Sequence, residues 1–359
     1  MYHLIALLIG FFVDLLLGDP HSIPHPVVWI GKLISAAEKL VRRLFPKTVR
    51  GENIAGGVLW VIVVLVSTAV PALLLYAAYR LHPAAGLVLE SIMCWQILAT
   101  RSLRDESMKV YAALKKGGAI IPVDSEQSAI FQCMAAGNRR EIQRLILTAS
   151  GGPFREYTKE QLKAVTPEQA GHHPTWRMGQ KITIDSATLF NKGLEIMEAS
   201  YLFDVPGERI SVLVHPESIV HSMVEYTDGC NMAQLSRPDM RLAIQYALTY
   251  PERTPGEFGR LRLEDMGKIS FYAPDTDKFP AIPMAYEALR EGRNLPIVYN
   301  GANEAAVDMF IRGKIRFDEI ADVVGYAMSR ADRGNILSLE DIIKTDRQAR
   351  RLAFEKGNA

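Results

Sequence analysis

The stretch IIPVDSEQSAIF, residues 120–131, separates two parts of the chain that differ in character. The apolar run AIIPV is rich in β-branched residues and predicts a short strand that ends at Asp124. Asp124 and Glu126 stand two positions apart, so on an extended segment their side chains share one face. Two carboxylates held together repel each other unless a cation joins them, and oxygen ligands suit Mg²⁺ or Mn²⁺. A solvated strand end with helix-capping acids fits the same spacing.

A second polar stretch, TIDSATLFNKGLE at residues 183–195, offers the third acid that such a metal site needs. Its hydroxyl, amide and ammonium donors, on Ser186, Asn191 and Lys192, could surround a phosphate. Glu195 could complete the ligand set. An ordinary helix start, capped by serine or aspartate, is the alternative from spacing alone.

Three further motifs are weaker. In LTASGGPFRE, residues 147–156, paired glycines let backbone amides approach an anion closely, although a plain turn fits equally well. The loop HHPTWRMG, residues 172–179, could form a lid over a ligand or simply be solvated. His215 and His221 are six positions apart, a spacing that does not favour one metal site, so we expect core or loop roles.

The chain before residue 118 is predicted to contain transmembrane helices. Residues 55–79 carry no charge and are long enough to cross the hydrocarbon core. Residues 3–18 form a shorter apolar run that contains Asp14 and fits a signal peptide poorly, and residues 84–100 are a weaker third candidate. The loop from residue 19 to 53 is rich in lysine and arginine, which places it and residues 101–359 on the cytoplasmic side.

Composition excludes several classes of protein. With 48% hydrophobic and 23% charged residues, a disordered chain is not expected. The net charge of +1 gives no argument for nucleic-acid binding. The cysteines Cys94, Cys133 and Cys230 suggest neither a disulfide framework nor a zinc site.

After residue 117 the pattern predicts an α+β fold. Strands are expected in RISVLVH, SIVHSMVEY and NMAQL, and amphipathic helices in REIQRLIL and DMRLAIQYAL. From Pro283 onward the chain is predicted to be helical, with Ser338 capping a helix. The expected domains are a membrane-helical segment at 1–117, a mixed α/β catalytic domain at 118–252, a linker at 253–283 and a C-terminal helical domain at 284–359.

From Ala119 onward the sequence closely resembles the 1-deoxy-D-xylulose 5-phosphate reductoisomerase family of non-mevalonate isoprenoid biosynthesis. The shared motifs are IIPVDSEQSAIFQ, LTASGGPFRE, HHPTWRMGQKITIDSATLFNKGLEIMEA, VLVHPESIVHSMVEY, SRPDMRLAIQYAL and NGANEAAV. The resemblance implies metal-dependent isomerisation of a small phosphorylated sugar, its reduction by NADPH, and a possible homodimer.

The resemblance also implies roles for individual residues. Asp124, Glu126 and Glu195 match the metal ligands, for Mg²⁺ or Mn²⁺, and Met240 matches a residue near the nicotinamide. The positions that match substrate-binding residues are Ser125, Ser150, His173, Trp176, Ser186, Asn191 and Lys192. Of these, Lys192 and His173 are also expected to take part in catalysis, and Trp176 matches the flap that closes over the substrate.

The sequence departs from this family at its beginning. The family starts with a dinucleotide-binding domain that carries a glycine-rich turn, and this chain has no such fingerprint. The NADPH-binding domain is therefore expected to be missing, which predicts an incomplete reaction.

Residues 1–116 resemble a different family, the membrane-embedded adenosylcobinamide-phosphate synthase of cobalamin biosynthesis. The motifs are DLLLGDPHSIPHPVVWIGKLI, GGVLWVIVV and SLRDESMKVYAAL, and the resemblance stops near Gly117. Three interpretations stay open: a membrane-tethered reductoisomerase fragment, a truncated synthase carrying a passenger, and a hybrid without a joint function.

Overall fold

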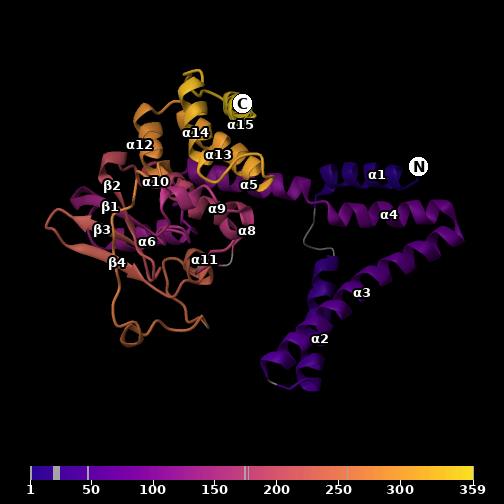
Figure 1. The fold of residues 1–359 in the computed structure, drawn as a ribbon. Helices are drawn as coiled ribbons and strands as arrows, with labels where there is room; N and C mark the ends of the chain where they lie inside the picture. Colours follow the sequence, from indigo (N-terminus) through magenta and orange to yellow (C-terminus); the bar gives the residue numbers. More distant parts are fainter. Residues whose placement is uncertain are drawn as a thin grey trace. The chain divides into compact units, whose positions relative to one another are not determined.

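The computed structural model describes residues 2–18, 25–46, 48–173, 175–176, 178–256 and 258–358. These residues form two compact units, Met1–Ile120 and Ile121–Ala359 (Figure 1). Part of the motif of the cobalamin synthases, residues 19–24, lies outside the described residues, as do positions 174 and 177 of the predicted lid.

The described residues of the first unit form helices joined by short connections, with no strand among them. Its elements are α1 (Tyr2–Leu17), α2 (Pro26–Leu44), α3 (Val49–Leu81), α4 (Pro83–Ile97) and α5 (Thr100–Lys115). By length and composition alone, two helical stretches, Gly51–Leu81 and Pro83–Lys115, could cross a membrane, which is weak support for the predicted spans. Large apolar side chains of α3, such as Trp60, Leu65 and Leu73, are exposed.

Asp14 lies near the end of α1, where it joins the helices of this unit. Its buried carboxylate accepts a hydrogen bond of 2.9 Å from the Thr100 amide at the start of α5. An acid suits this place because the first amides of a helix have no partner within the helix. Nearby, the Trp95 indole donates to the carbonyl oxygen of Gly18 at 2.8 Å, so α1 and α4 are tied at the same end.

The second unit is built on a four-stranded mixed sheet. Its strands are β1 (Ile142–Ala149), β2 (Ile210–Val214), β3 (Val220–Tyr226) and β4 (Asn231–Leu235), in the order β2-β1-β3-β4. β1 runs parallel to β2 and antiparallel to β3, and β3 runs antiparallel to β4. The strands predicted in RISVLVH, SIVHSMVEY and NMAQL are confirmed.

Two predictions about local structure are wrong. REIQRLIL, expected to be a helix, forms most of β1, a central strand in which six of eight residues are buried because both faces of the sheet are covered there. AIIPV, expected to be a strand, has no regular structure, and Pro122 lacks the amide that a ladder needs. Asp124 is instead the N-cap residue of helix α6 (Ser125–Cys133), and Glu126 lies in its first turn.

Helices pack around the sheet and form the C-terminal end of the unit (Figure 1). They are α7 (Lys159–Leu162), α8 (Pro167–Ala170), α9 (Gln180–Thr188), α10 (Phe190–Phe203), α11 (Met240–Thr249), α12 (Ala281–Glu291), α13 (Leu295–Ile311), α14 (Glu319–Arg330) and α15 (Leu339–Gly357). Short 3-10 turns occur at Met134–Ala136, Arg139–Glu141, Gly207–Arg209 and Leu263–Asp265. The predicted helix in DMRLAIQYAL, the helical C-terminus and the Ser338 cap of α15 are confirmed.

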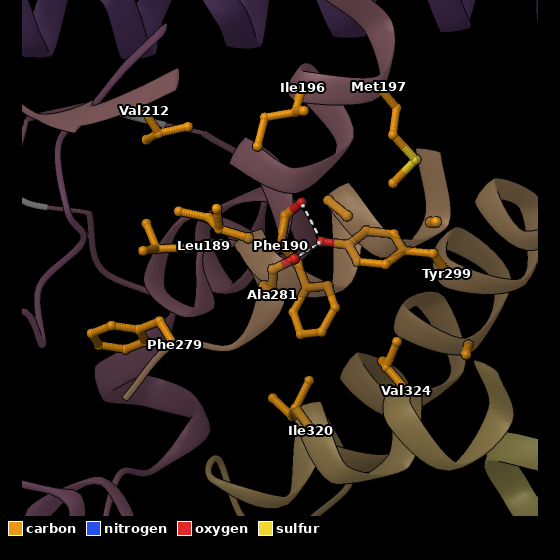
Figure 2. Packing of buried hydrophobic residues seen from close by; sticks show 14 of the residues in the cluster. Leu189, Phe190, Ile196, Met197, Val212, Phe279, Ala281, Tyr299, Ile320 and Val324 are labelled. Atoms are coloured by element: carbon orange, nitrogen blue, oxygen red, sulfur yellow. Dashed lines mark hydrogen bonds between the residues drawn. The ribbon is translucent and has the colours of Figure 1, made fainter. Parts of the chain in front are cut away.

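A single apolar core joins the sheet to the C-terminal helices, and Figure 2 shows its centre. The ring of Tyr299, on α13, packs against Phe190 with ring centroids 5.1 Å apart. Gly193 makes this approach possible, since a Cβ atom there would lie 1.9 Å from the Tyr299 hydroxyl oxygen. All three cysteines are free, as predicted.

Candidate functional site

Three carboxylates from two helices meet at one point of the second unit. Asp124 and Glu126 come from the start of α6, and Glu195 comes from α10. Each offers an oxygen atom, and these atoms lie within 4.8 Å of one another. A set of oxygen-only anionic ligands at this separation fits a hard divalent cation.

The acids of this cluster destabilise one another's charged forms. Burial, with the negative charge of Glu126, raises the pKa of Asp124 to about 7. Burial and the same neighbour raise the pKa of Glu195 well above its usual range. Removing carboxylates from water and placing them together favours the protonated form, unless a cation is present.

Lys192, on α10, supplies a positive charge inside the cluster. Its ammonium donates a hydrogen bond of 2.8 Å to Glu126 and another to Glu195. Burial acts to lower the pKa of Lys192, but the two carboxylates outweigh it and the pKa is raised. Burial acts to raise the pKa of Glu126, but the positive charge of Lys192 outweighs this effect. The pKa of Glu126 is therefore lowered. The lysine is therefore a permanent cation at the site.

Amide side chains hold Glu195 in place. Gln127, which is fully buried on α6, donates to the backbone carbonyl of Glu195 at 3.0 Å. Asn191 donates to one carboxylate oxygen of Glu195. On α6 the Ser125 hydroxyl donates to Glu126. The acids are thus fixed by neighbours on both helices.

Ser150 follows β1 and carries a hydroxyl that its neighbours orient. The Nδ1 atom of His173 accepts from the amides of Thr175 and Trp176, so the proton of the neutral ring is on Nε2. Burial lowers the pKa of His173, which favours this neutral form. Nε2 lies 2.9 Å from the Ser150 oxygen, which also accepts from the Gly152 amide at 3.2 Å. With both lone pairs engaged, the serine is left to donate its own proton to a ligand.

A cavity of about 300 Å³ connects these groups. All eleven residues that the sequence assigned to the site line it: Asp124, Ser125, Glu126, Ser150, His173, Trp176, Ser186, Asn191, Lys192, Glu195 and Met240. The structure therefore brings the predicted residues together, while their individual roles stay predictions.

The cavity wall also contains residues that sequence reasoning missed. Thr148, Ile182, Leu189 and Ser218 are among them, while Met178, from the predicted lid, lines the cavity as well. They are apolar or small polar residues whose types carry no signal of their own. Their signal is position alone: Thr148, Ile182 and Leu189 each lie within a few residues of a predicted site residue, and Ser218 lies between the two histidines of the VHPESIVHSM motif.

Both histidines of the VHPESIVHSM motif are buried, which agrees with the core or loop roles expected for them. The Nε2 atom of His215 accepts hydrogen bonds from the amides of Ile219 and Val220, so the ring holds the turn before β3. Both rings also line the cavity, which the sequence did not predict. The ring of His221 lies 6.3 Å from that of Trp176.

An acid cluster beside donors for an anion, on an α+β unit, is the arrangement expected of a domain that binds a divalent cation next to an anionic group. Comparison with family models identifies the same two families as the sequence motifs. Residues 120–203 match the model of the 1-deoxy-D-xylulose 5-phosphate reductoisomerase C-terminal domain, and residues 235–352 match that of the DXP reductoisomerase C-terminal domain. Residues 7–125 match the CobD/Cbib protein family. The chain is thus a hybrid in sequence, and its larger part resembles the reductoisomerases.

Individual relatives show the same resemblance. A curated 1-deoxy-D-xylulose 5-phosphate reductoisomerase of Acetivibrio thermocellus is 50% identical over 243 residues, which is 68% of this chain and 64% of the relative. That of Chlorobium phaeobacteroides is 54% identical over 65% of this chain and 61% of the relative. The chain therefore spans less than two thirds of the length of these relatives.

Solved structures of reductoisomerases share the fold. The enzyme from Zymomonas mobilis, in complex with NADPH, superposes with a TM-score of 0.65 at 42% identity, covering 70% of this chain and 65% of that one. A reductoisomerase in complex with NADPH, fosmidomycin and magnesium gives a TM-score of 0.63 at 40% identity, covering 69% of this chain and 65% of that one.

Proposed function

We propose that residues 121–359 bind 1-deoxy-D-xylulose 5-phosphate with Mg²⁺ or Mn²⁺ and perform the metal-dependent isomerisation of the reductoisomerases. One observation carries the proposal. Carboxylate oxygens of Asp124, Glu126 and Glu195 lie within 4.8 Å of one another, and the same cavity contains the donors of Ser150, Ser186 and Lys192. The three carboxylates fit a divalent cation because the positive charge of the neighbouring lysine is too small to neutralise them.

The residues of the cavity would have different roles in binding the ion and the substrate. The three carboxylates would hold the ion, which would supply chelation of the hydroxy-ketone end and stabilise the charge that develops there. Ser150, with its proton free to donate, would bind the phosphate together with Ser186, Asn191 and Lys192 (all lining the cavity). This grip on the distant end positions the reacting carbons. Trp176 would cover the ligand and exclude water.

Reduction needs more than these residues supply. Met240 begins α11 and lines the cavity, where it would contact a nicotinamide ring. A methionine has no group that binds the phosphates of a dinucleotide. The named cavity residues would account for metal and substrate binding, and the phosphates of NADPH would need other residues.

Calorimetric titration of the full chain with fosmidomycin and Mg²⁺, in detergent, tests the proposal. We expect saturable binding that requires the metal and falls at least tenfold in Asp124→Asn and Glu195→Gln, because each loses an anionic ligand. Glu208→Gln, an exposed acid on the same unit, is the matched control and should bind as the wild type does. Binding that ignores both substitutions at the acid cluster contradicts the proposal.

We also propose that the first unit inserts into a membrane and keeps residues 101–359 in the cytoplasm. The exposed apolar surface of α3 supports this, because such a surface is unfavourable in water. The basic residues that follow residue 100 support the orientation. Retention in the pellet after alkaline carbonate extraction is the expected result, and release into the supernatant contradicts it.

A truncated adenosylcobinamide-phosphate synthase is the second candidate, favoured by the match of residues 7–125 to the CobD/Cbib family. That enzyme joins an amino-alcohol phosphate to a corrinoid carboxylate. Formation of this amide by the full chain would favour the second candidate.

Sequencing of genomic DNA across codons 115–120 tests whether the joint between the two parts of the chain is real. The oligomeric state of the chain in detergent tests the expected homodimer.

A further inference from the structure

The corner between α9 and α10 carries three of the donors in the cavity. Ser186 lies near the end of α9, and Asn191 and Lys192 lie in the first turn of α10. Leu189 makes the corner with a φ of 64°, a left-handed conformation that is unfavourable for a branched side chain. Such a corner keeps its shape only if its surroundings hold it.

Helix α13 contacts this corner through two residues on one face. Tyr299 and Asn303 are four positions apart, so their side chains point the same way. The Tyr299 hydroxyl lies 3.1 Å from the carbonyl oxygen of Ala281 and 3.4 Å from that of Phe190, the first residue of α10 (Figure 2). Through these contacts α13 fixes the start of α10.

Asn303 fixes the end of α9. Its amide donates a hydrogen bond of 2.9 Å to Asp185, the residue directly before Ser186. Both side chains are buried, and neither lines the cavity. The second oxygen of Asp185 pairs with Lys181 at 2.7 Å, and Lys181 also binds Glu304 of α13 at 2.9 Å. Two bonds thus lead from α13 to the turn of α9 that carries Ser186.

The side chain of Asn303 is only partly satisfied by hydrogen bonds. The Oδ1 atom of Asn303 is buried and has no hydrogen-bond partner in the described part of the chain. A buried, unsatisfied polar oxygen costs free energy that an apolar residue would avoid. The hydrogen bond that the Asn303 side chain makes in the described residues is therefore the one from its nitrogen to Asp185.

We propose that Asn303, acting through Asp185, is a positioning residue that sets the affinity for the phosphate end of the ligand. This inference rests on the proposed function of Ser186 as a donor to the phosphate. The acid cluster is held by Gln127 on α6 and by Asn191 and Lys192 in the first turn of α10, which Tyr299 contacts and Asn303 does not. Loosening the bond between residues 185 and 303 therefore displaces Ser186, which weakens phosphate binding and leaves metal binding unchanged.

A reciprocal exchange in the full chain tests the proposal. Asn303→Asp places two carboxylates together, and we expect fosmidomycin to bind about tenfold more weakly in the presence of Mg²⁺, which is about 1.4 kcal/mol. The double variant Asp185→Asn with Asn303→Asp restores a donor opposite an acceptor and should bind within about threefold of the wild type. Such a rescue measures the pair itself. Asn303→Ser, which removes the amide without adding charge, should give an intermediate loss.

Mn²⁺ binding to the same variants without inhibitor, followed by electron paramagnetic resonance, separates the two halves of the site. It should stay within twofold of the wild type in every variant. Asp308→Asn, a similar change on the partly exposed side of α13, is the control and should alter neither reading. Wild-type affinity in Asn303→Asp, parallel loss of Mn²⁺ and fosmidomycin binding, or absence of rescue each overturns the proposal. Failure of the wild type to bind fosmidomycin refutes the proposed function instead.

Discussion

The substitution Asp124→Asn is expected to stabilise the metal-free protein at neutral and alkaline pH. Burial and the charge of Glu126 raise the pKa of Asp124 from 3.8 to about 7. A carboxyl whose pKa is higher in the folded state binds more protons when folded, so stability falls as the pH rises from about 4 to 7. At about 1.36 kcal/mol for each pH unit, the penalty reaches roughly 4 kcal/mol above pH 7. Asparagine keeps the shape and removes this penalty.

Thermal unfolding of both proteins in detergent, without metal, at pH 4.5 and pH 8 measures the effect. The two should unfold at similar temperatures at pH 4.5, and the variant should unfold several degrees higher at pH 8. Saturating Mg²⁺ should then stabilise the wild type and leave the variant unchanged, because the ligand set is broken. A variant that is no more stable at pH 8, or that gains equally at both pH values, refutes the electrostatic argument.

Four further results are expected. Gly193→Ala forces a methyl group against Tyr299 and should destabilise the second unit by about 1–3 kcal/mol, whereas Gly334→Ala, outside any helix and with open space around its Cβ, should be neutral in the same unfolding assay. Burial raises the pKa of Cys133 to about 11, so a thiol reagent at pH 8 should label exposed Cys230 first in a mass-spectrometric time course. Ser150→Ala should weaken fosmidomycin binding about tenfold by calorimetry while Mn²⁺ binding is retained. The chain alone should not oxidise NADPH with 1-deoxy-D-xylulose 5-phosphate, and sustained turnover would show that it has a complete cofactor site.

The candidate site was more predictable than its local structure. Long motifs named Asp124, Glu126 and Glu195 together, and the structure places them together. The argument from spacing reached Asp124 and Glu126 through a strand, where side chains two apart share a face. In the structure they converge because both stand at the N-terminal end of α6. Spacing alone does not distinguish a strand from the N-terminus of a helix. The difference depends on Pro122, which lacks an amide, and on whether a neighbouring strand pairs with residues 119–123.

Other features depended on packing that the sequence does not show. β1 was mistaken for a helix because a central strand buries both faces, and its apolar run then lacks strict alternation. The contact of Lys192 with Glu195 had a signal in their spacing of three on a helix. Its contact with Glu126 had none, because the two residues meet only through the packing of α6 on α10.

The position of Lys192 has a consequence for the order of events in the cell. A protein that carries an internal counter-ion for its acids can complete folding before it meets a metal. On the proposed function, metal loading would be a competition between the incoming ion and the Lys192 ammonium, which is covalently part of the chain. A phosphorylated ligand that attracts this ammonium would free the acids, so ion and ligand would each make room for the other.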